Sequence, residues 1–393
     1  MDAKNLEKTT CTECNLTIKL PVVAEREKAL CPRCGYLLTV NHPFALERIL
    51  AFATSALMFL ILALSFDFVA INYQGQTYSI ALLDTYFLLT EQHYFIIALV
   101  VMLTVIVLPV LVLSALFFLI FNIKAEHYPL KGELVAKCLF ALLPWSMAEI
   151  FLIGVLVSLI KISTMTQVHI NLSFYAYVFF AISYIAAISF VDKRQLYLKL
   201  QALAALKAEQ HTNHKNNSSQ SPSNVGKVNT SIQQTWALIF TAFLLYFPAN
   251  FLPIMTTRSL GKDEFNTILG GVIVLWRDGS YPVAIIIFIA SIVVPIIKFI
   301  VLAWLNYSVQ QGDNSYQLQR AQLYRITEFI GRWSMIDIFA VAILASLIQL
   351  GTAMVIHPGP AAVSFCAVVI LTMLAANTFD STLIWKKTPS YER

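Results

Sequence analysis

Eight hydrophobic stretches constrain the fold of this chain more than any other feature of its sequence. About 20 apolar residues in a helix cross the roughly 30 Å hydrocarbon core of a bilayer. Charged residues make up only 12% of the chain, against about 25% in soluble proteins. The sequence therefore predicts an all-α polytopic membrane protein, with crossings at 49–70, 95–121, 146–161, 172–191, 235–256, 283–305, 334–351 and 360–380. The third and seventh stretches are short and need flanking residues to complete a crossing.

The basic residues predict the orientation of these crossings. Eight crossings place both termini on the same side, and the head, tail and loops of that side hold 21 of the 27 Lys and Arg residues. The opposite loops hold only Arg258, Lys262 and Arg277. Because basic loops stay in the cytoplasm, we expect both termini to be cytoplasmic. The net charge of +5 then follows from topology, and we expect no nucleic-acid partner. The first hydrophobic stretch follows a polar head, so we also expect no signal peptide.

Four cysteines in that head have the spacing of a metal site. Cys11, Cys14, Cys31 and Cys34 form two C-x2-C pairs, and each pair supplies two ligands for a tetrahedral Zn²⁺. We predict a zinc ribbon over residues 1–45, with one structural zinc that folds a head too small for its own core. A catalytic zinc is less consistent with this motif, because four cysteines fill all four ligand positions of the metal. A redox pair and two disulfides remain alternatives.

The sequence contains an internal repeat. "PWSMAEIF" at 144–151 returns as "RWSMIDIF" at 332–339, and "VIVLPVLVL" at 105–113 aligns with "SIVVPIIKF" at 291–299. The even number of crossings in each half makes the repeats parallel. We predict two tandem four-helix transmembrane modules, at 46–200 and 233–393, joined by a flexible linker at 201–232, where polar residues of low complexity are concentrated.

The repeated phrase has the spacing of a helix start. Ser146 and Glu149 match Ser334 and Asp337 as capping boxes. Pro144 and Gly331 stand just before them, where a preceding helix should break. We therefore expect interfacial helices at about 130–143 and 317–330, each followed by an elbow into the membrane.

Ionisable residues inside the hydrophobic stretches are costly and are therefore functional candidates. Lys298 is the clearest, and Ser291 lies two turns earlier on the same helix face. Lys298 and Asp337 fall at similar depths and could pair. We predict a polar cluster in the second module, formed by Ser291, Lys298, Ser334, Asp337 and Thr372. The alternative is a lysine that extends its ammonium to the membrane surface. Glu149 aligns with Asp337 but faces no such lysine, and we expect it to be only a cap.

Four motifs occur in this order along the chain: the cysteine head, "LLYFPANFLPIM" at 244–255, "IFIASIVVPIIKF" at 287–299 and "GRWSMIDIFAVAIL" at 331–344. Together they resemble the paraquat-inducible protein A family. The family includes the inner-membrane subunit of a lipophilic envelope-spanning tunnel. The resemblance implies an inner-membrane protein of Gram-negative bacteria that works with periplasmic MCE-domain tunnel proteins and takes part in lipid trafficking. Longer relatives carry a second four-cysteine ribbon, but residues 200–234 contain no cysteine.

Three classes of function are then in competition. The first is a component that loads or moves lipids between the inner membrane and an MCE tunnel, with the polar cluster coupling proton movement to lipid handling. The alternative is a membrane-bound metal or redox stress sensor that uses the ribbon. An enzyme ranks last, because we find no paired carboxylates at suitable spacing and no nucleophile–histidine arrangement. The sequence has no G-x4-GK[ST] loop, so we expect no nucleotide-driven step.

Overall fold

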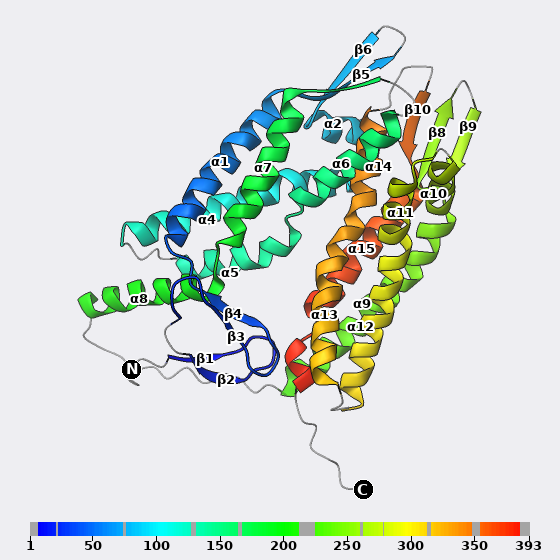
Figure 1. Ribbon diagram of the computed structural model, residues 1–393. Coiled ribbons are helices and arrows are strands. Elements are labelled where there is room, and N and C mark those ends of the chain that lie inside the picture. The colour runs from blue at the N-terminus through cyan, green and yellow to red at the C-terminus, as the bar shows by residue number, and fades with distance from the viewer. Residues whose placement is uncertain are drawn as a thin grey trace.

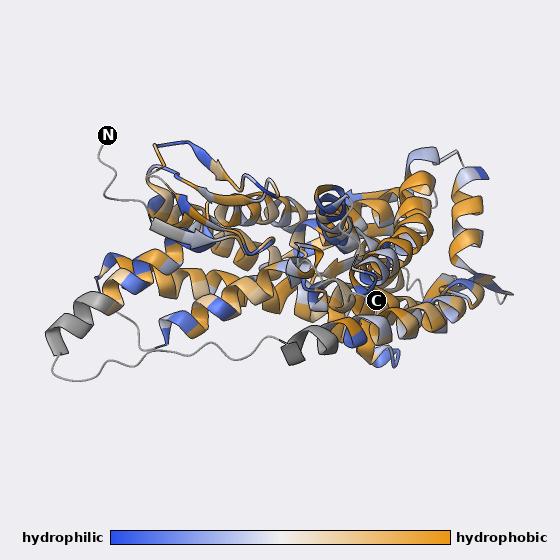
Figure 2. Ribbon diagram, turned by 90° about the horizontal axis from the view of Figure 1, so that it is seen from below, coloured by the Kyte–Doolittle hydropathy of each residue, from blue (hydrophilic) through white to orange (hydrophobic). Residues whose placement is uncertain are grey.

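A computed structural model describes most of the chain as two groups of helices that stand side by side, with a small β-rich head at one end (Figure 1). The described residues are 7–20, 23–73, 76–126, 131–163, 167–211, 225–259, 262–277, 279–312, 316–347 and 354–385. Within them, eight helices are long and apolar enough to cross a membrane. Hydrophobic residues cover most of the helical ribbon (Figure 2). The prediction of eight helices able to cross a membrane is confirmed.

The first half contains four of these spans. They are α1 (Ala45–Ser65); α3 (Phe95–Met102) with η1 (Leu103–Val107) and α4 (Leu108–Lys124); α5 (Gly132–Leu142) with η2 (Leu143–Trp145) and α6 (Ala148–Ser163); and α7 (Leu172–Ser189). The short helix α2 (Asp84–Glu91) precedes α3, and α8 (Lys193–His211) follows α7.

The second half contains the other four spans in the same order. They are α9 (Val225–Phe251); α11 (Tyr281–Phe288) with η3 (Ile289–Val293) and α12 (Val294–Gln310); α13 (Gln317–Gly331) with η4 (Arg332–Met335) and α14 (Ile336–Leu347); and α15 (Pro360–Thr378). The short helix α10 (Ile268–Arg277) precedes α11, and η5 (Ser381–Trp385) follows α15. Helices cover both ends of the predicted linker at 201–232, since α8 ends at His211 and α9 begins at Val225; residues 212–224 lie outside the described residues.

The expectation of an all-α fold is wrong in part, because the described chain also forms four small antiparallel sheets. Two hairpins form the head: β1 (Glu7–Thr10) with β2 (Thr17–Leu20), and β3 (Lys28–Leu30) with β4 (Leu37–Val40). At the opposite end, β5 (Asp67–Tyr73) pairs with β6 (Gln76–Ala81) and β7 (Gln167–Ile170). The second half has a matching sheet there, in which β8 (Met255–Ser259) pairs with β9 (Lys262–Asn266) and β10 (Met354–Pro358). The first predicted crossing ran to residue 70 because Phe68, Val69 and Ile71 of β5 are apolar and buried as well.

Each half contains one π-helical turn at the same place in its order of elements. Pro109 follows η1 and Pro295 follows η3. Proline has no N–H to donate to the carbonyl four residues earlier, and a π turn accommodates this loss inside a continuous helix. Ser291 lies in the π turn of the second half. The π turn therefore places the polar side chain of Ser291 near the middle of the crossing, where the helix is locally widened.

The helices α6 and α14 form the main contact between the two halves, and α14 also packs against α2 and α3. A Cβ on Gly154 would lie 2.9 Å from the Cβ of Phe339, so the two helices approach closely only because residue 154 is glycine. The Ser158 hydroxyl donates a hydrogen bond to the backbone oxygen of Ala340 at 3.1 Å. The large hydrophobic core runs through this contact and includes buried residues from both halves.

The helix breaks predicted at Pro144 and Gly331 are confirmed, but the capping boxes are wrong. α5 and α13 each end in a 3-10 turn at these positions. However, the Ser146 hydroxyl accepts a hydrogen bond from Tyr184, and the buried Ser334 hydroxyl has no hydrogen-bond partner in the described residues. Tertiary contacts between crossings thus take the place of local caps. Helices occupy both ranges expected for interfacial helices, and their location at a membrane surface stays a prediction.

Candidate functional site

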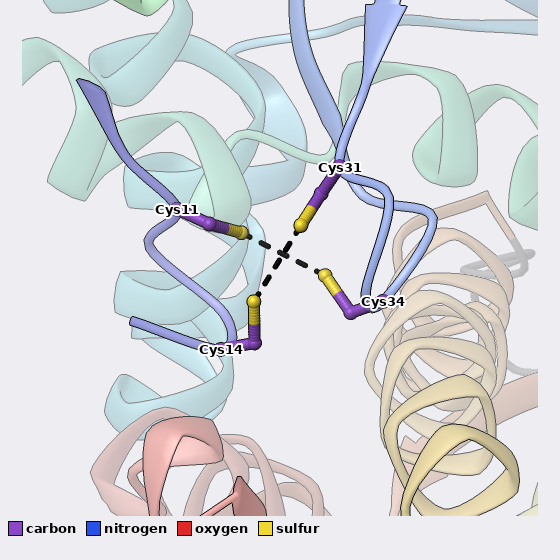
Figure 3. Close-up of side chains that lie close together, drawn as sticks. All are labelled: Cys11, Cys14, Cys31 and Cys34. Carbon is purple, nitrogen blue, oxygen red and sulfur yellow. Dashed lines mark hydrogen bonds between the residues drawn. The ribbon is translucent and has the colours of Figure 1, made fainter. Parts of the chain in front are cut away.

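The four cysteines of the head lie together in one buried cluster. Two tight turns between paired strands bring them there, and Gly35 has the positive φ of 67° that the second turn requires. All four sulfur atoms lie within 4.8 Å of one another. The sulfurs of Cys11 and Cys34 are 3.7 Å apart, and those of Cys14 and Cys31 are 3.5 Å apart, so the two pairs cross (Figure 3).

This geometry fits a tetrahedral metal ion. Four thiolates at about 2.3 Å from one Zn²⁺ would lie about 3.8 Å from one another, close to the two distances measured. A disulfide needs about 2.05 Å, and all four cysteines are free. Burial alone would raise the pKa of the Cys31 thiol, but backbone N–H groups of Cys34 and Arg33 lower this pKa to about 7. A lowered pKa favours the thiolate form of Cys31, which is the form that binds a metal ion.

The head, which we call the ribbon, contacts both halves of the protein. On the first half, Asp192 accepts hydrogen bonds from the Thr39 hydroxyl at 2.6 Å and the Val40 N–H at 2.8 Å. The carbonyl of Val40 accepts another from Gln195 at 2.8 Å.

On the second half, the guanidinium of Arg325 donates to the Cys34 carbonyl at 3.1 Å and lies over the ring of Tyr36. Arg33 lies over the ring of Trp385, 4.7 Å from its centroid. The ribbon thus joins the ends of the two halves on one side of the molecule, which we call the ribbon end.

The predicted polar cluster is buried between the crossings of the second half. Lys298 is only 2% exposed and Asp337 only 4%. The Lys298 ammonium donates a hydrogen bond to the Thr372 hydroxyl at 2.8 Å. The Ser291 hydroxyl donates to the carboxylate of Asp337. Lys298 also packs on Gly331, where an added Cβ would lie 2.9 Å from the ammonium nitrogen.

The structure divides the five predicted residues into two contacts rather than one. Lys298 pairs with Thr372, and Asp337 pairs with Ser291; within the described residues Lys298 and Asp337 form no ion pair. Ser334 is buried nearby in η4 without a hydrogen bond. The direct lysine–carboxylate pair expected from helical depth is therefore not formed. Depth alone did not show that Thr372 of α15 lies closer to the lysine.

The two contacts line different cavities. Lys298 faces a cavity of about 260 Å³ at the ribbon end, between the two halves. Asp337 lines a smaller pocket, together with Met255, Ile268 and Leu275 near the opposite sheet. The basic and the acidic group thus face opposite ends of the crossings.

Sequence reasoning missed part of the larger cavity. Glu149 of the first half lines it, beside Tyr184, whose hydroxyl donates to Ser146 at 2.7 Å. Arg332 of the second half lines it too. The signal was the repeated phrase itself, since Glu149 and Asp337 are equivalent acids, but only the structure shows that they face different spaces.

Fold and site together define a multi-pass membrane protein of two four-span halves, with a four-thiol ribbon and a buried polar set. Its sequence matches the family described as Paraquat-inducible protein A over residues 46–201 and 232–389, and the chain belongs to that family.

Curated relatives align along almost their whole length. The chain is 37% identical to the intermembrane transport protein PqiA of Escherichia coli, with 97% of this chain and 96% of the relative covered. It is 28% identical to a probable intermembrane transport protein of Haemophilus influenzae, with 96% and 95% covered. It is also 28% identical to the lipophilic envelope-spanning tunnel protein A of Escherichia coli, with 95% and 90% covered. No solved structure matches the chain.

Proposed function

We propose that this protein is the inner-membrane component of an MCE-type lipid transport system. In this role it loads or moves phospholipids between the inner membrane and a periplasm-spanning MCE tunnel, and it is not an enzyme. The observation that carries the proposal is the nearly full-length match to a protein named for intermembrane transport. A second relative is named for a lipophilic tunnel across the envelope, which agrees with a lipid as the transported molecule.

The proposed orientation places the ribbon end and both termini in the cytoplasm. The two three-stranded sheets then face the periplasm. We expect the MCE-domain protein to contact this face through 71–94 and 257–282, which include β8, β9 and the short helices α2 and α10. The two halves are the products of a tandem duplication in this proposal, which accounts for the common order of their elements.

In this proposal the four cysteine thiolates of the ribbon bind one Zn²⁺. The ion keeps the ribbon folded, and the ribbon joins the two halves at the cytoplasmic end through Asp192 and Arg325. Structural zinc supplies folding free energy directly in small domains of this kind.

The buried polar set couples proton movement to lipid handling in this proposal. A carboxylate out of contact with water is costly to ionise unless a charge or hydrogen bonds compensate it. Asp337 has the Ser291 hydroxyl as its donor, and Lys298 has Thr372 as its acceptor. Since the two groups line cavities at opposite ends, protons reach Asp337 from the periplasmic side and Lys298 from the cytoplasmic side.

Lipid transfer between vesicles tests the function. The full-length protein is reconstituted with its MCE partner, and transfer of a fluorescent phospholipid to acceptor vesicles is followed. We expect transfer with both proteins present and only background transfer with either one alone. An absence of transfer with the assembled complex, under an imposed proton gradient of either direction, would contradict the proposal.

The second candidate is a metal or redox sensor. Contacts of the ribbon with both halves favour it, because a change at the thiols would alter how the halves are held together. Serine variants of the four cysteines distinguish the two functions. A sensor loses its response to metal or oxidant while the protein stays assembled, whereas a transporter loses folding or partner binding.

A further inference from the structure

The cavity at the ribbon end is lined by groups of both charge signs. It lies between the halves and has a volume of about 260 Å³. η2, α6 and α7 of the first half supply part of its wall, and α12, α13, η4 and α15 of the second half supply another part. Two carboxylates and two cations face it, from Glu149, Glu328, Lys298 and Arg332.

These four charges form no close ion pair with one another. None of them has an oppositely charged atom within 4.0 Å in the described part of the chain, although Arg332 interacts electrostatically with both Glu149 and Glu328 over a longer distance. Lys298 donates to the neutral Thr372 hydroxyl, and Arg332 lies over the ring of Phe329. Lys298 is buried, whereas Glu149, Glu328 and Arg332 are partly exposed. A buried charge without a partner of opposite sign is costly. A ligand with one negative and one positive group would compensate the lysine and both carboxylates.

The four charged groups come from four different segments around the cavity. Lys298 extends from the second turn of α12 and packs against Gly331, directly before Arg332. The two carboxylates come from different halves, Glu149 from the start of α6 and Glu328 from the last turn of α13. The two cations are suited to a phosphate, and the two acids to a primary ammonium, which has three N–H donors.

Apolar residues at the edge of the cavity indicate where the long chains of a bound ligand can extend out of it. Ile185 and Ile188 of α7 line it beside Met373 of α15. Ile185 is also 44% exposed, and bilayer lipid can cover the exposed apolar side chains of a crossing helix. Acyl chains can therefore lie along α7 while a polar group occupies the cavity.

We propose that this cavity binds the headgroup of a zwitterionic aminophospholipid, with its phosphate at Lys298 and Arg332 and its primary ammonium at Glu149 and Glu328. The inference rests on the proposed lipid transport and adds a headgroup preference to it. A glycerol headgroup leaves both carboxylates without a cation, and a choline headgroup offers them no N–H donor.

Binding of short-chain lipids to the purified full-length protein tests the preference. Dihexanoyl phosphatidylethanolamine and dihexanoyl phosphatidylglycerol are titrated calorimetrically below their micelle concentrations. Since charge-assisted hydrogen bonds are lost with the glycerol headgroup, we expect about tenfold weaker binding of that lipid. The double variant Glu149→Gln, Glu328→Gln should bind both lipids within about twofold of one another, because the neutral amides keep the shape but not the charge. Glu133→Gln is the matched control, since Glu133 is an exposed acid of α5 outside the cavity.

Three results would overturn the inference. They are equal binding of the two lipids by the unchanged protein, a preference that survives in the double variant, and binding of soluble glycerophosphoethanolamine as tightly as the lipid. The last would show that the ligand is a soluble phosphate ester. Vesicle transfer is scored separately: transfer without headgroup preference removes only this inference, and selective binding without transfer removes only the transport function.

Discussion

Phe151 and Phe339 meet edge to face between the two halves, with ring centroids 5.5 Å apart and ring planes at 76°. They are the last residues of the repeated phrases "PWSMAEIF" and "RWSMIDIF". The last residues of the two similar phrases thus contact each other across the interface between the halves. The position of this pair explains why Gly154, one turn further on α6, lies directly against Phe339.

Gly154→Ala should weaken the contact between the halves. The added methyl would lie 2.9 Å from the Phe339 Cβ and 3.2 Å from the Ile336 carbonyl, and both belong to a helix that cannot yield easily. Overpacking of this kind costs about 1–3 kcal/mol. Thermal unfolding of the purified protein in detergent should show a lower midpoint.

Gly271→Ala is the matched control for that change. Gly271 is also in a helix, α10, but nothing lies within 4 Å of the Cβ it would gain. Alanine in place of a helical glycine stabilises by about 0.5–1 kcal/mol, so the midpoint should stay or rise. Equal destabilisation by both substitutions would show that the close packing of α6 against α14 is not the reason why Gly154→Ala destabilises the protein.

The sequence predicts the crossings, the helix breaks and the four-cysteine cluster, because each depends on local signals. Hydropathy locates spans, Pro144 and Gly331 end helices, and the C-x2-C spacing brings thiols together. The partners of polar side chains depend on how separate crossings pack. Ser146 therefore bonds Tyr184 instead of capping a helix, and Lys298 bonds Thr372 instead of Asp337.

Cys14→Ser should remove the metal from the ribbon and loosen it. A four-ligand zinc site loses most of its affinity with one thiolate gone, and the ribbon has little other core. Elemental analysis should fall from one zinc per chain towards none, with a lower unfolding midpoint. Cys138→Ser is the control, because Cys138 is exposed on α5, away from the cluster. Zinc retained in full by the Cys14 variant would contradict the assignment.

Asp192→Ala should free the ribbon from the first half. The Asp192 carboxylate accepts from Thr39 and Val40 of the ribbon and from the N–H of Arg194 at 2.8 Å, where α8 begins. Hydrogen exchange of a peptide spanning residues 37–41 should speed up by about tenfold, which corresponds to about 1.4 kcal/mol.

Asp380→Ala is its natural control. Asp380 follows Asp192 by 188 residues, the same offset as between the two repeated phrases. Its carboxylate accepts only from Thr382 in the described residues. Exchange in the ribbon should not change in this variant. If both variants, or neither, altered exchange at residues 37–41, the contact through Asp192 would not be what holds the ribbon.

Lys298→Ala should abolish lipid-barrier function in cells while expression and binding to the partner persist. The change removes a buried ammonium that reaches both Thr372 and the cavity between the halves. Gly331→Ala tests the same position without removing the charge, because its methyl would displace the ammonium from 2.9 Å away. We expect a partial loss there, of about tenfold in transfer rate if one charged hydrogen bond is lost. Lys137→Ala on the exposed face of α5 is the control and should be silent. Full barrier function in the Lys298 variant would show that this lysine has only a structural role, and it would contradict the proposed proton coupling.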